Sequence, residues 1–375
     1  MSVGRRNPRI DAIRGVSILL VLFHHFNIAY RLNDTFLAQA FGWDAVRAVA
    51  RNGNYGVTMF FVISGYLITS NADRRWAGLS GIDARAFYRL RIARIVPCLL
   101  LLLGTVNLFA LAGVAMFQNH APAGTAVSFW LVNLASLTFW MNVLVGMHGW
   151  VNYPLGVLWS LSVEEVFYLF FPILCLVLRR ESRLLVFWAA IIVIGPLYRL
   201  AHQGDDGGFL YAYFASFDGI AIGCCTALLA KRIALRGRAA TFLQGVVVAA
   251  MVCLYLVGPI AETNVLGVTG MALGTAVLLL GASGQAATAT AAVGGVRVLR
   301  GFFEWFGQLS YELYLFHLIV LGVMRTLWPP HDVAGDVKLL ILVGFLVLSA
   351  GLSAGIARVF AEPLNRGIRA WRTAA

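Results

Sequence analysis

Long apolar runs constrain this sequence more than any other feature. A transmembrane helix needs roughly 20 mostly apolar residues, and such runs lie near residues 13–32, 56–72, 95–115, 157–178, 184–200, 211–230, 241–258, 265–283, 307–327 and 338–360. Only 12% of the 375 residues are charged and 60% are hydrophobic, whereas a soluble domain carries about 25% charged residues. The sequence therefore predicts an all-α, polytopic membrane protein with about ten transmembrane helices.

The distribution of basic residues predicts how these spans are oriented. Loops that are rich in Lys and Arg stay on the cytoplasmic side of a membrane, so we expect both the N- and the C-terminus there. The net charge of +12 then reports topology, and we expect the lipid bilayer, not nucleic acid, as the partner of the basic surface. With this orientation, 23 of the 29 basic residues fall in the cytoplasmic segments 1–14, 71–94, 179–183, 231–238, 284–303 and 358–375.

A further apolar run, 127–146, is ambiguous by length alone. If it crossed the membrane, every later loop would change sides, and the basic pairs at 179–180 and 231–232 would face outward. The stretch 116–156 contains no Lys or Arg. We therefore predict that 127–146 is a re-entrant or outer-leaflet segment, and that residues 1–375 form a single membrane-embedded domain without an appended soluble domain.

Two ionisable residues of the first span are candidates for function, because such groups are costly inside a membrane. Arg14 and His25 are eleven residues apart, which on an α-helix is about 16 Å and within roughly 20° of three full turns. Both side chains therefore face the same way, with Arg14 at the cytoplasmic surface and His25 well inside. The cation could hold an anionic cytosolic ligand, and the imidazole could act as general base toward a hydroxyl. Alternatively, Arg14 is a topological anchor and His25 a packing residue.

Two adjacent carboxyl groups lie near the start of the span at 157–178. Ser160, Glu164 and Tyr168 fall at i, i+4 and i+8 and share one helix face, whereas Glu165 points about 100° away. One acid could orient a histidine or bind a substrate hydroxyl. The alternative is that the acids cap a cavity or pair with an Arg of another helix.

Polar residues also interrupt two later spans. Ser310, Tyr314 and His317 share a face at i, i+4 and i+7, and a polar stripe on an apolar helix faces protein or a cavity. It could line an acceptor path or serve as packing. Asp218 lies within a span and needs an Arg or hydroxyl partner, for structure or for function.

The second span and the loop after it carry two weaker signals. Ser64-Gly65 lowers helix propensity within a membrane helix and allows either a close approach of another helix or a local break. The segment 71–94 is expected to form an Arg-rich helix on the membrane surface. Its Arg91 and Arg94 could bind the phosphates of CoA or lipid head groups.

Taken together, these segments resemble the acyltransferase 3 family of integral membrane O-acyltransferases. The order and spacing of the motifs carry the resemblance. It implies ten spans in a bacterial inner membrane, acyl-CoA as donor from the cytoplasm, and a hydroxyl of an extracytoplasmic glycan, such as lipopolysaccharide or exopolysaccharide, as acceptor of an acetyl or longer acyl group. The matching motifs are Arg14 with His25, Phe60 to Tyr66, Arg91-x-x-Arg94, Trp159-x-Leu-x-x-Glu164, Phe217-Asp218, Ser310-Tyr311-x-Leu-Tyr314-x-x-His317 and Glu362-Pro363.

The resemblance also implies roles for particular residues. His25 would be the catalytic base and Glu164 a catalytic or substrate-orienting acid, while Arg14, Arg91 and Arg94 would bind the acyl-CoA. No zinc-type spacing, phosphate-cradling Gly-rich loop or Gly-x-Ser-x-Gly turn occurs, so we expect no metal and no tightly bound cofactor. The residues expected to line or support the substrate path are His24, Ser64, Tyr66, Trp159, Ser160, Glu165, Tyr168, Asp218, Ser310, Tyr311, Tyr314 and His317.

Two other classes of protein compete with this interpretation. A proton-coupled transporter or flippase of a glycan precursor would also use ten spans with buried His and Glu, but it predicts symmetry between the two halves, which the sequence lacks. A structural or sensory membrane subunit would leave His25 and Glu164 without a role.

Overall fold

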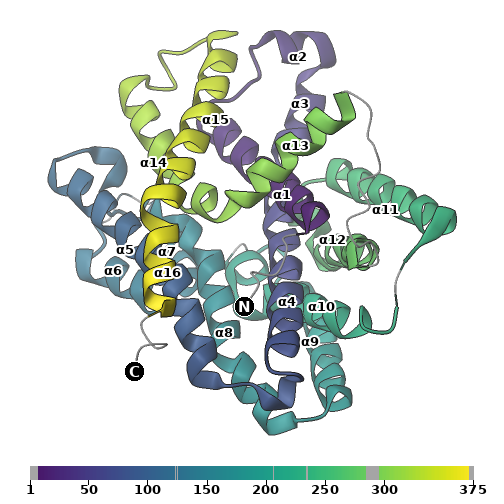
Figure 1. Cartoon of the computed structure of the whole chain (residues 1–375). Helices are drawn as coiled ribbons and strands as arrows, with labels where there is room; N and C mark the ends of the chain where they lie inside the picture. Colours follow the sequence, from purple (N-terminus) through teal and green to yellow (C-terminus); the bar gives the residue numbers. More distant parts are fainter. Residues whose placement is uncertain are drawn as a thin grey trace.

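The computed structural model describes residues 7–370 except 123, 125, 206, 234 and 284–294. Within these ranges the regular structure is helical, with one isolated bridge between His120 and Ala126 and no β-strand, which confirms the all-α prediction. The predicted cytoplasmic segments 1–14, 284–303 and 358–375 extend beyond the described residues. Figure 1 shows α1 and α4 in the middle of the bundle, with α11 and α12 on one side and α5, α6 and α7 on the other.

Ten helices of the described chain have 17 or more residues, and each coincides with one predicted span. Among the described residues, eight helical segments are long and apolar enough to cross a membrane, and α13 with α14, bent by 78°, would make a ninth. The chain is thus built as a polytopic membrane protein. The ten are α1 (Pro8–Ala29), α4 (Asn54–Arg75), α5 (Ala84–Leu111), α8 (Leu158–Leu178), α9 (Glu181–Ala201), α10 (Tyr213–Leu229), α11 (Gly237–Val257), α12 (Ile260–Ser283), α14 (Ser310–Leu327) and α15 (Val337–Ile356).

Helix α4 is long enough to cross a membrane but too polar to be counted by composition. It packs against α1, α10 and α12, and 13 of its 22 residues are buried, Thr58 and Thr69 among them. Polar groups in a membrane protein are placed against protein and not against lipid, so α4 belongs in the middle of the bundle. The total of ten spans stays a prediction.

The ambiguous run 127–146 forms two short helices and not one long helix. Helices α6 (Phe129–Leu137) and α7 (Met141–His148) are separated by a break in which Phe139 has φ 60°. Nine or eight residues rise only about 12–14 Å, which is less than half the hydrocarbon thickness of about 30 Å. Neither helix can cross alone, as expected for a re-entrant segment.

The remaining elements are short and connect or flank the long helices. They are α2 (Phe36–Phe41), α3 (Trp43–Ala50), α13 (Gly295–Gln308), α16 (Glu362–Ala370), the 3-10 turns η1 (Leu79–Gly81), η2 (Ala115–Phe117) and η3 (Leu155–Val157), and the π-turns η4 (Gly207–Tyr211) and η5 (Ala357–Ala361).

The prediction of a separate surface helix over 71–94 is wrong. Helix α4 continues to Arg75, and α5 begins at Ala84, where the side chain of Asp83 accepts a hydrogen bond of 3.0 Å from the backbone N–H of Ala86. From this cap the helix runs to Leu111 and accommodates Pro97 in its interior. The arginines expected on a surface helix therefore form the first turns of a membrane helix.

Gly65 explains how closely α4 and α10 approach each other. A Cβ atom at Gly65 would lie 2.1 Å from the carbonyl oxygen of Ile220, and one at Gly223 would lie 2.1 Å from that of Val62. Small residues let membrane helices pack backbone against backbone. Of the two alternatives for Ser64-Gly65, the close approach is confirmed and the local break is wrong, because α4 is continuous.

We expect Gly65→Ala to lower the free energy of unfolding by about 1–3 kcal/mol, because the added methyl group overpacks this crossing. Unfolding by SDS in mixed micelles would measure it. Gly104→Ala on α5 is the matched control, since a Cβ atom there meets nothing within 4 Å. Equal stability changes in the two variants would contradict the packing argument.

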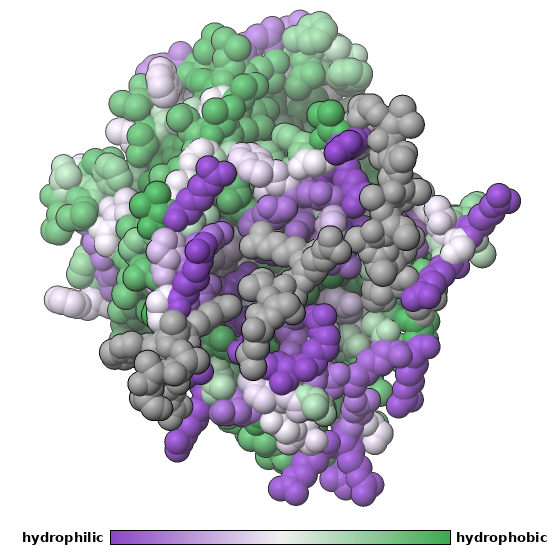
Figure 2. All heavy atoms as spheres, in the orientation of Figure 1, coloured by the Kyte–Doolittle hydropathy of each residue, from purple (hydrophilic) through white to green (hydrophobic). Residues whose placement is uncertain are grey.

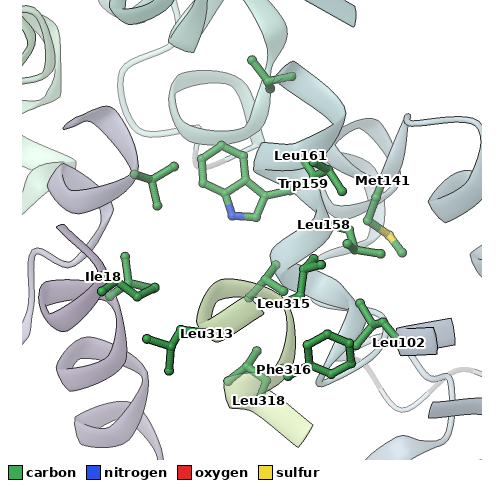
Figure 3. Close-up of a cluster of buried hydrophobic side chains, with 14 of the residues drawn as sticks. Ile18, Leu102, Met141, Leu158, Trp159, Leu161, Leu313, Leu315, Phe316 and Leu318 are labelled. Carbon is green, nitrogen blue, oxygen red and sulfur yellow. The ribbon is translucent and has the colours of Figure 1, made fainter. Parts of the chain in front are cut away.

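The centre of the bundle is a continuous apolar core that holds α14 in place. Figure 3 shows Ile18 of α1 facing Leu313 of α14, with Phe316 of α14 beside Leu102 of α5. All four side chains are buried. The core therefore fixes the position of α14, which carries several of the predicted site residues.

The surface separates polar and apolar residues. In Figure 2, hydrophilic residues gather over the centre and lower part of the face in view, and hydrophobic residues cover its upper part. Large apolar side chains such as Leu111, Val186 and Val347 are exposed. An exposed apolar surface of this extent is suited to lipid contact.

Candidate functional site

A large cavity lies at the end of the bundle where α1 begins, α4 ends and α5 begins. Its volume is about 860 Å³, within the range of about 300–1,000 Å³ that is usual for small-ligand sites. We call it the basic cavity. Four acidic residues share its lining with five basic ones, which are Arg14, Arg74, Arg94, Lys231 and Arg358.

A narrower space, which we call the passage, adjoins the basic cavity and has a volume of about 130 Å³. Arg14, Asn71, Arg94 and Tyr311 are among the residues that line both spaces, so the two spaces meet at these side chains. Phe60, Phe61, Val57 and Ile63 make much of the passage wall apolar. The combination gives a wide polar entrance and a narrow, mostly apolar interior.

One wall of the passage is the predicted polar face of α8. Ser160, Glu164 and Tyr168 all line it, whereas Glu165 does not, which confirms the helical spacing argument. The Tyr168 hydroxyl donates to Glu164 Oε2 at 3.1 Å and lies 2.8 Å from Ser64 Oγ, another residue of the lining. Glu164 is thus tied to hydroxyl groups within the passage, and the hypothesis that one acid orients a histidine is not supported.

The three arginines predicted to bind acyl-CoA lie together where the basic cavity meets the passage. Arg14 and Arg94 line both spaces, and Arg91 lines the passage. The Arg91 guanidinium lies 5.6 Å from the centre of the Tyr168 ring, and that of Arg94 lies 5.8 Å from the Tyr311 ring. Cation–π contacts at these distances orient a guanidinium without consuming its hydrogen-bond donors.

The deep part of the passage includes Ser160 of α8 and Tyr314 of α14. Ser160 Oγ donates to the Tyr314 hydroxyl at 2.6 Å, and that hydroxyl donates to the carbonyl oxygen of Val157 at 3.1 Å. The Tyr314 ring centre lies 6.1 Å from that of His317. The passage therefore approaches the histidines of the bundle.

His25 and His317 meet beside this deep part, although they are 292 residues apart in sequence. Their ring centres are 5.0 Å apart, and His25 Nδ1 lies 3.2 Å from His317 Nε2. His317 is fully buried, whereas His25 is partly accessible. Neither histidine lines the passage, and of the two only His25 is partly accessible.

Several predicted support residues hold the site from outside its lining. His24 Nδ1 lies 2.8 Å from the carbonyl oxygen of Ala50 and ties α1 to the end of α3. The Trp159 ring packs between Phe61 and Tyr211, at 6.2 and 5.3 Å. Of the other predicted supports, Tyr66 lines the basic cavity and Ser310 the passage, whereas Glu165 and His317 line neither space.

Asp218 lines neither the basic cavity nor the passage. Its carboxylate forms a bidentate pair with Arg199, at 3.1 and 2.8 Å, and both side chains are fully buried. Thr269 Oγ1 donates to the same carboxylate at 2.7 Å. Of the two roles left open by the sequence, the structure supports the structural one.

Some residues of the site carried no recognisable signal in the sequence. Trp150 lies 6.2 Å from the His25 ring, centre to centre, but it comes from a loop without periodicity. Lys231 and Arg358 line the basic cavity, although in the sequence they indicated only which loops are cytoplasmic. In the part of the chain that the structure describes, no three His, Cys, Asp or Glu side chains come together as a metal site would require.

Comparisons with known proteins identify the family. The acyltransferase domain family (Acyl_transf_3) matches residues 7–358. The O-acetyltransferase OatA of Staphylococcus aureus (strain NCTC 8325 / PS 47) is 27% identical over 237 residues, which is 61% of this chain and 36% of that protein. YrhL of Bacillus subtilis (strain 168), provisionally named a peptidoglycan O-acetyltransferase, is 27% identical over 236 residues, 59% of this chain and 33% of its own.

These matches therefore span about a third of the length of the curated relatives. No solved structure matches the chain. The family match covers nearly the whole chain and includes every residue that lines the two cavities except Ala361, Glu362 and Asn365. The chain belongs to the acyltransferase 3 family.

Proposed function

We propose that this protein is a membrane O-acyltransferase of a bacterial inner membrane. It transfers an acyl group, in the simplest case acetyl, from cytoplasmic acyl-CoA to a hydroxyl of an extracytoplasmic glycan. The observation that carries the proposal is the basic cavity with its adjoining passage, whose lining residue Tyr314 lies beside the pair formed by His317 and His25. The names of the relatives support it, because OatA is called an O-acetyltransferase and YrhL is provisionally named a peptidoglycan O-acetyltransferase.

The proposed position of acyl-CoA follows from the charges that line the two spaces and from their different widths. Arg14 and Arg94 lie where the basic cavity narrows, and arginine binds phosphate through paired, charge-assisted hydrogen bonds. The nucleotide part of CoA stays in the wide cavity, and its linear pantetheine arm enters the passage. There the hydroxyls of Ser64 and Tyr168, which bond each other while Tyr168 also bonds Glu164, are available to the amides of the arm.

The proposed reaction needs a base that activates the acceptor hydroxyl for attack on the thioester of acyl-CoA. His25 Nε2 takes the proton of the acceptor hydroxyl, and the hydroxyl oxygen attacks the thioester carbonyl carbon. The new C–O bond forms as the C–S bond breaks, and CoA leaves as a thiolate. The thiolate receives the proton held by His25, so the products are the acylated glycan and the CoA thiol.

The proposal is tested on the surface glycans of the producing bacterium. We expect NMR to detect ester-linked acyl groups in the wild type, to lose them in a deletion strain and to regain them when the gene is restored. If the glycan itself left the surface and its precursor accumulated inside, the protein would be a carrier and the proposal would fail.

The donor site is tested in the same strain by two charge reversals. Arg94→Glu should reduce the ester signal about tenfold or more, because a charged hydrogen bond contributes about 1.5–3 kcal/mol. Arg183→Glu, at an exposed basic position outside both spaces, should leave it unchanged. Equal signals in the two variants would rule out the donor site at Arg94.

A further inference from the structure

We infer that His317 is a positioning residue that holds His25 in one tautomer, with its proton on Nδ1 and a free lone pair on Nε2. The catalytic meaning of this inference rests on the proposed function. The tautomer itself is a property of the folded chain and can be measured without any activity.

The hydrogen bonds of His317 fix its own tautomer first. Its Nδ1 lies 2.9 Å from the carbonyl oxygens of both Leu313 and Tyr314. A carbonyl oxygen only accepts, so Nδ1 must carry a hydrogen. A neutral imidazole has one N–H, and therefore His317 Nε2 presents a lone pair.

That lone pair then determines the state of His25. His25 Nδ1 lies 3.2 Å from His317 Nε2 and 3.0 Å from the carbonyl oxygen of Val21. Both neighbours are acceptors, so His25 Nδ1 must be the donor. With either histidine in the opposite tautomer, a nitrogen lone pair would face a carbonyl oxygen, so the assignment with hydrogen on both Nδ1 atoms satisfies every contact.

This arrangement prepares His25 Nε2 for proton transfer. In water a neutral imidazole prefers its hydrogen on Nε2, which would block the atom that must act as base. The acceptors on the Nδ1 side oppose that preference. When Nε2 takes a proton from the acceptor hydroxyl, Nδ1–H is retained, and its bond to His317 becomes charge-assisted.

The surroundings of His317 keep it in this position. It is fully buried, and its neighbours Leu313 and Phe316 belong to the core between α1, α14 and α5 (Figure 3). In serine proteases a buried carboxylate orients the catalytic histidine. Here a second, neutral histidine occupies the corresponding place, while Glu164 is bonded to Tyr168.

Nitrogen-15 solid-state NMR of histidine-labelled protein in lipid bilayers tests the tautomer. The signals of His25 are identified as those lost in His25→Asn. We expect wild-type His25 to show a protonated Nδ1 and an unprotonated Nε2, and we expect His317→Leu to shift it toward the Nε2-protonated form. A wild-type His25 with hydrogen on Nε2 would overturn the inference.

Kinetics of acyl transfer in proteoliposomes test the consequence. His317→Leu should reduce kcat about 10- to 100-fold, the usual effect of losing an orienting partner, without changing KM for acyl-CoA. His317→Gln should recover most of the rate, because its amide oxygen can accept from His25. Wild-type rates in both variants would contradict the positioning role.

The two proposals can fail separately. If the wild-type protein showed the expected tautomer but no acyl transfer from acyl-CoA, the proposed function would be wrong and the tautomer assignment would stand. If transfer were normal in His317→Leu, the proposed function would stand and the positioning role would be wrong.

Discussion

His25→Asn is expected to reduce the rate of acyl transfer about 1,000-fold while the protein inserts and folds as the wild type does. A positioned general base contributes roughly 10²–10⁴ to a rate. The asparagine amide can still donate to Val21 and His317 from near the position of Nδ1, so the packing is preserved and only the base is removed. Transfer from radiolabelled acyl-CoA in proteoliposomes would measure the loss.

His202→Asn is the matched control for this experiment. His202 Nδ1 also bonds the carbonyl oxygen four residues earlier, that of Tyr198, at 2.8 Å, and its ring stacks on the Tyr198 ring. Its side-chain hydrogen bond and ring contact are with Tyr198 and not with His317 or the passage, so its rate should stay near that of the wild type. A well-inserted His25→Asn protein that kept its rate within tenfold would remove His25 as the base.

The membrane fold could be predicted largely from sequence, because the cost of placing polar groups in lipid applies to every residue of a contiguous run. A run of about 20 apolar residues must be helical in lipid, since every backbone polar group needs a partner within the run. Helix α4 is the difficult case, because its polar residues are buried against other helices and reduce its hydropathy. The basic residues then separated the broken segment 127–146 from the true long helices, which apolarity alone could not do.

Site residues could be predicted where the argument needed only to know which residues share one face of a single helix. The face shared by Ser160, Glu164 and Tyr168 is local information, and all three line the passage. The contact between His25 and His317 joins α1 to α14 and depends on how the bundle packs. Periodicity placed each histidine on a face but could not pair them, and it left open whether one of the two adjacent acids orients a histidine or binds a substrate hydroxyl.

Local patterns also failed where two outcomes had the same signature. Ser64-Gly65 is equally compatible with a helix break and with a close crossing, and only the position of Ile220 on α10 decides between them. An Arg-rich segment before an apolar run can be a surface helix or the first turns of the membrane helix. The cap at Asp83 and the unbroken α5 decide that case.

Asp218→Leu is expected to lower the free energy of unfolding by about 3–5 kcal/mol, because it leaves the buried charge of Arg199 without its carboxylate. Arg199 would keep only neutral partners, among them the carbonyl oxygen of Ala215 at 2.5 Å. Since Asp218 lines neither the basic cavity nor the passage, the protein that still folds should transfer acyl groups at the wild-type rate. Unfolding by SDS in mixed micelles would measure the stability.

The double variant Arg199→Met with Asp218→Leu distinguishes a lost charge pair from lost packing. Replacing a whole buried ion pair with apolar side chains of similar volume is often neutral or stabilising, whereas removing one partner is not. We therefore expect the double variant to recover more than half of the stability lost in Asp218→Leu. If the two substitutions instead added their losses, as independent sites do, the pair would be contributing packing alone, and Asp218 would not be held in the bundle by its charge.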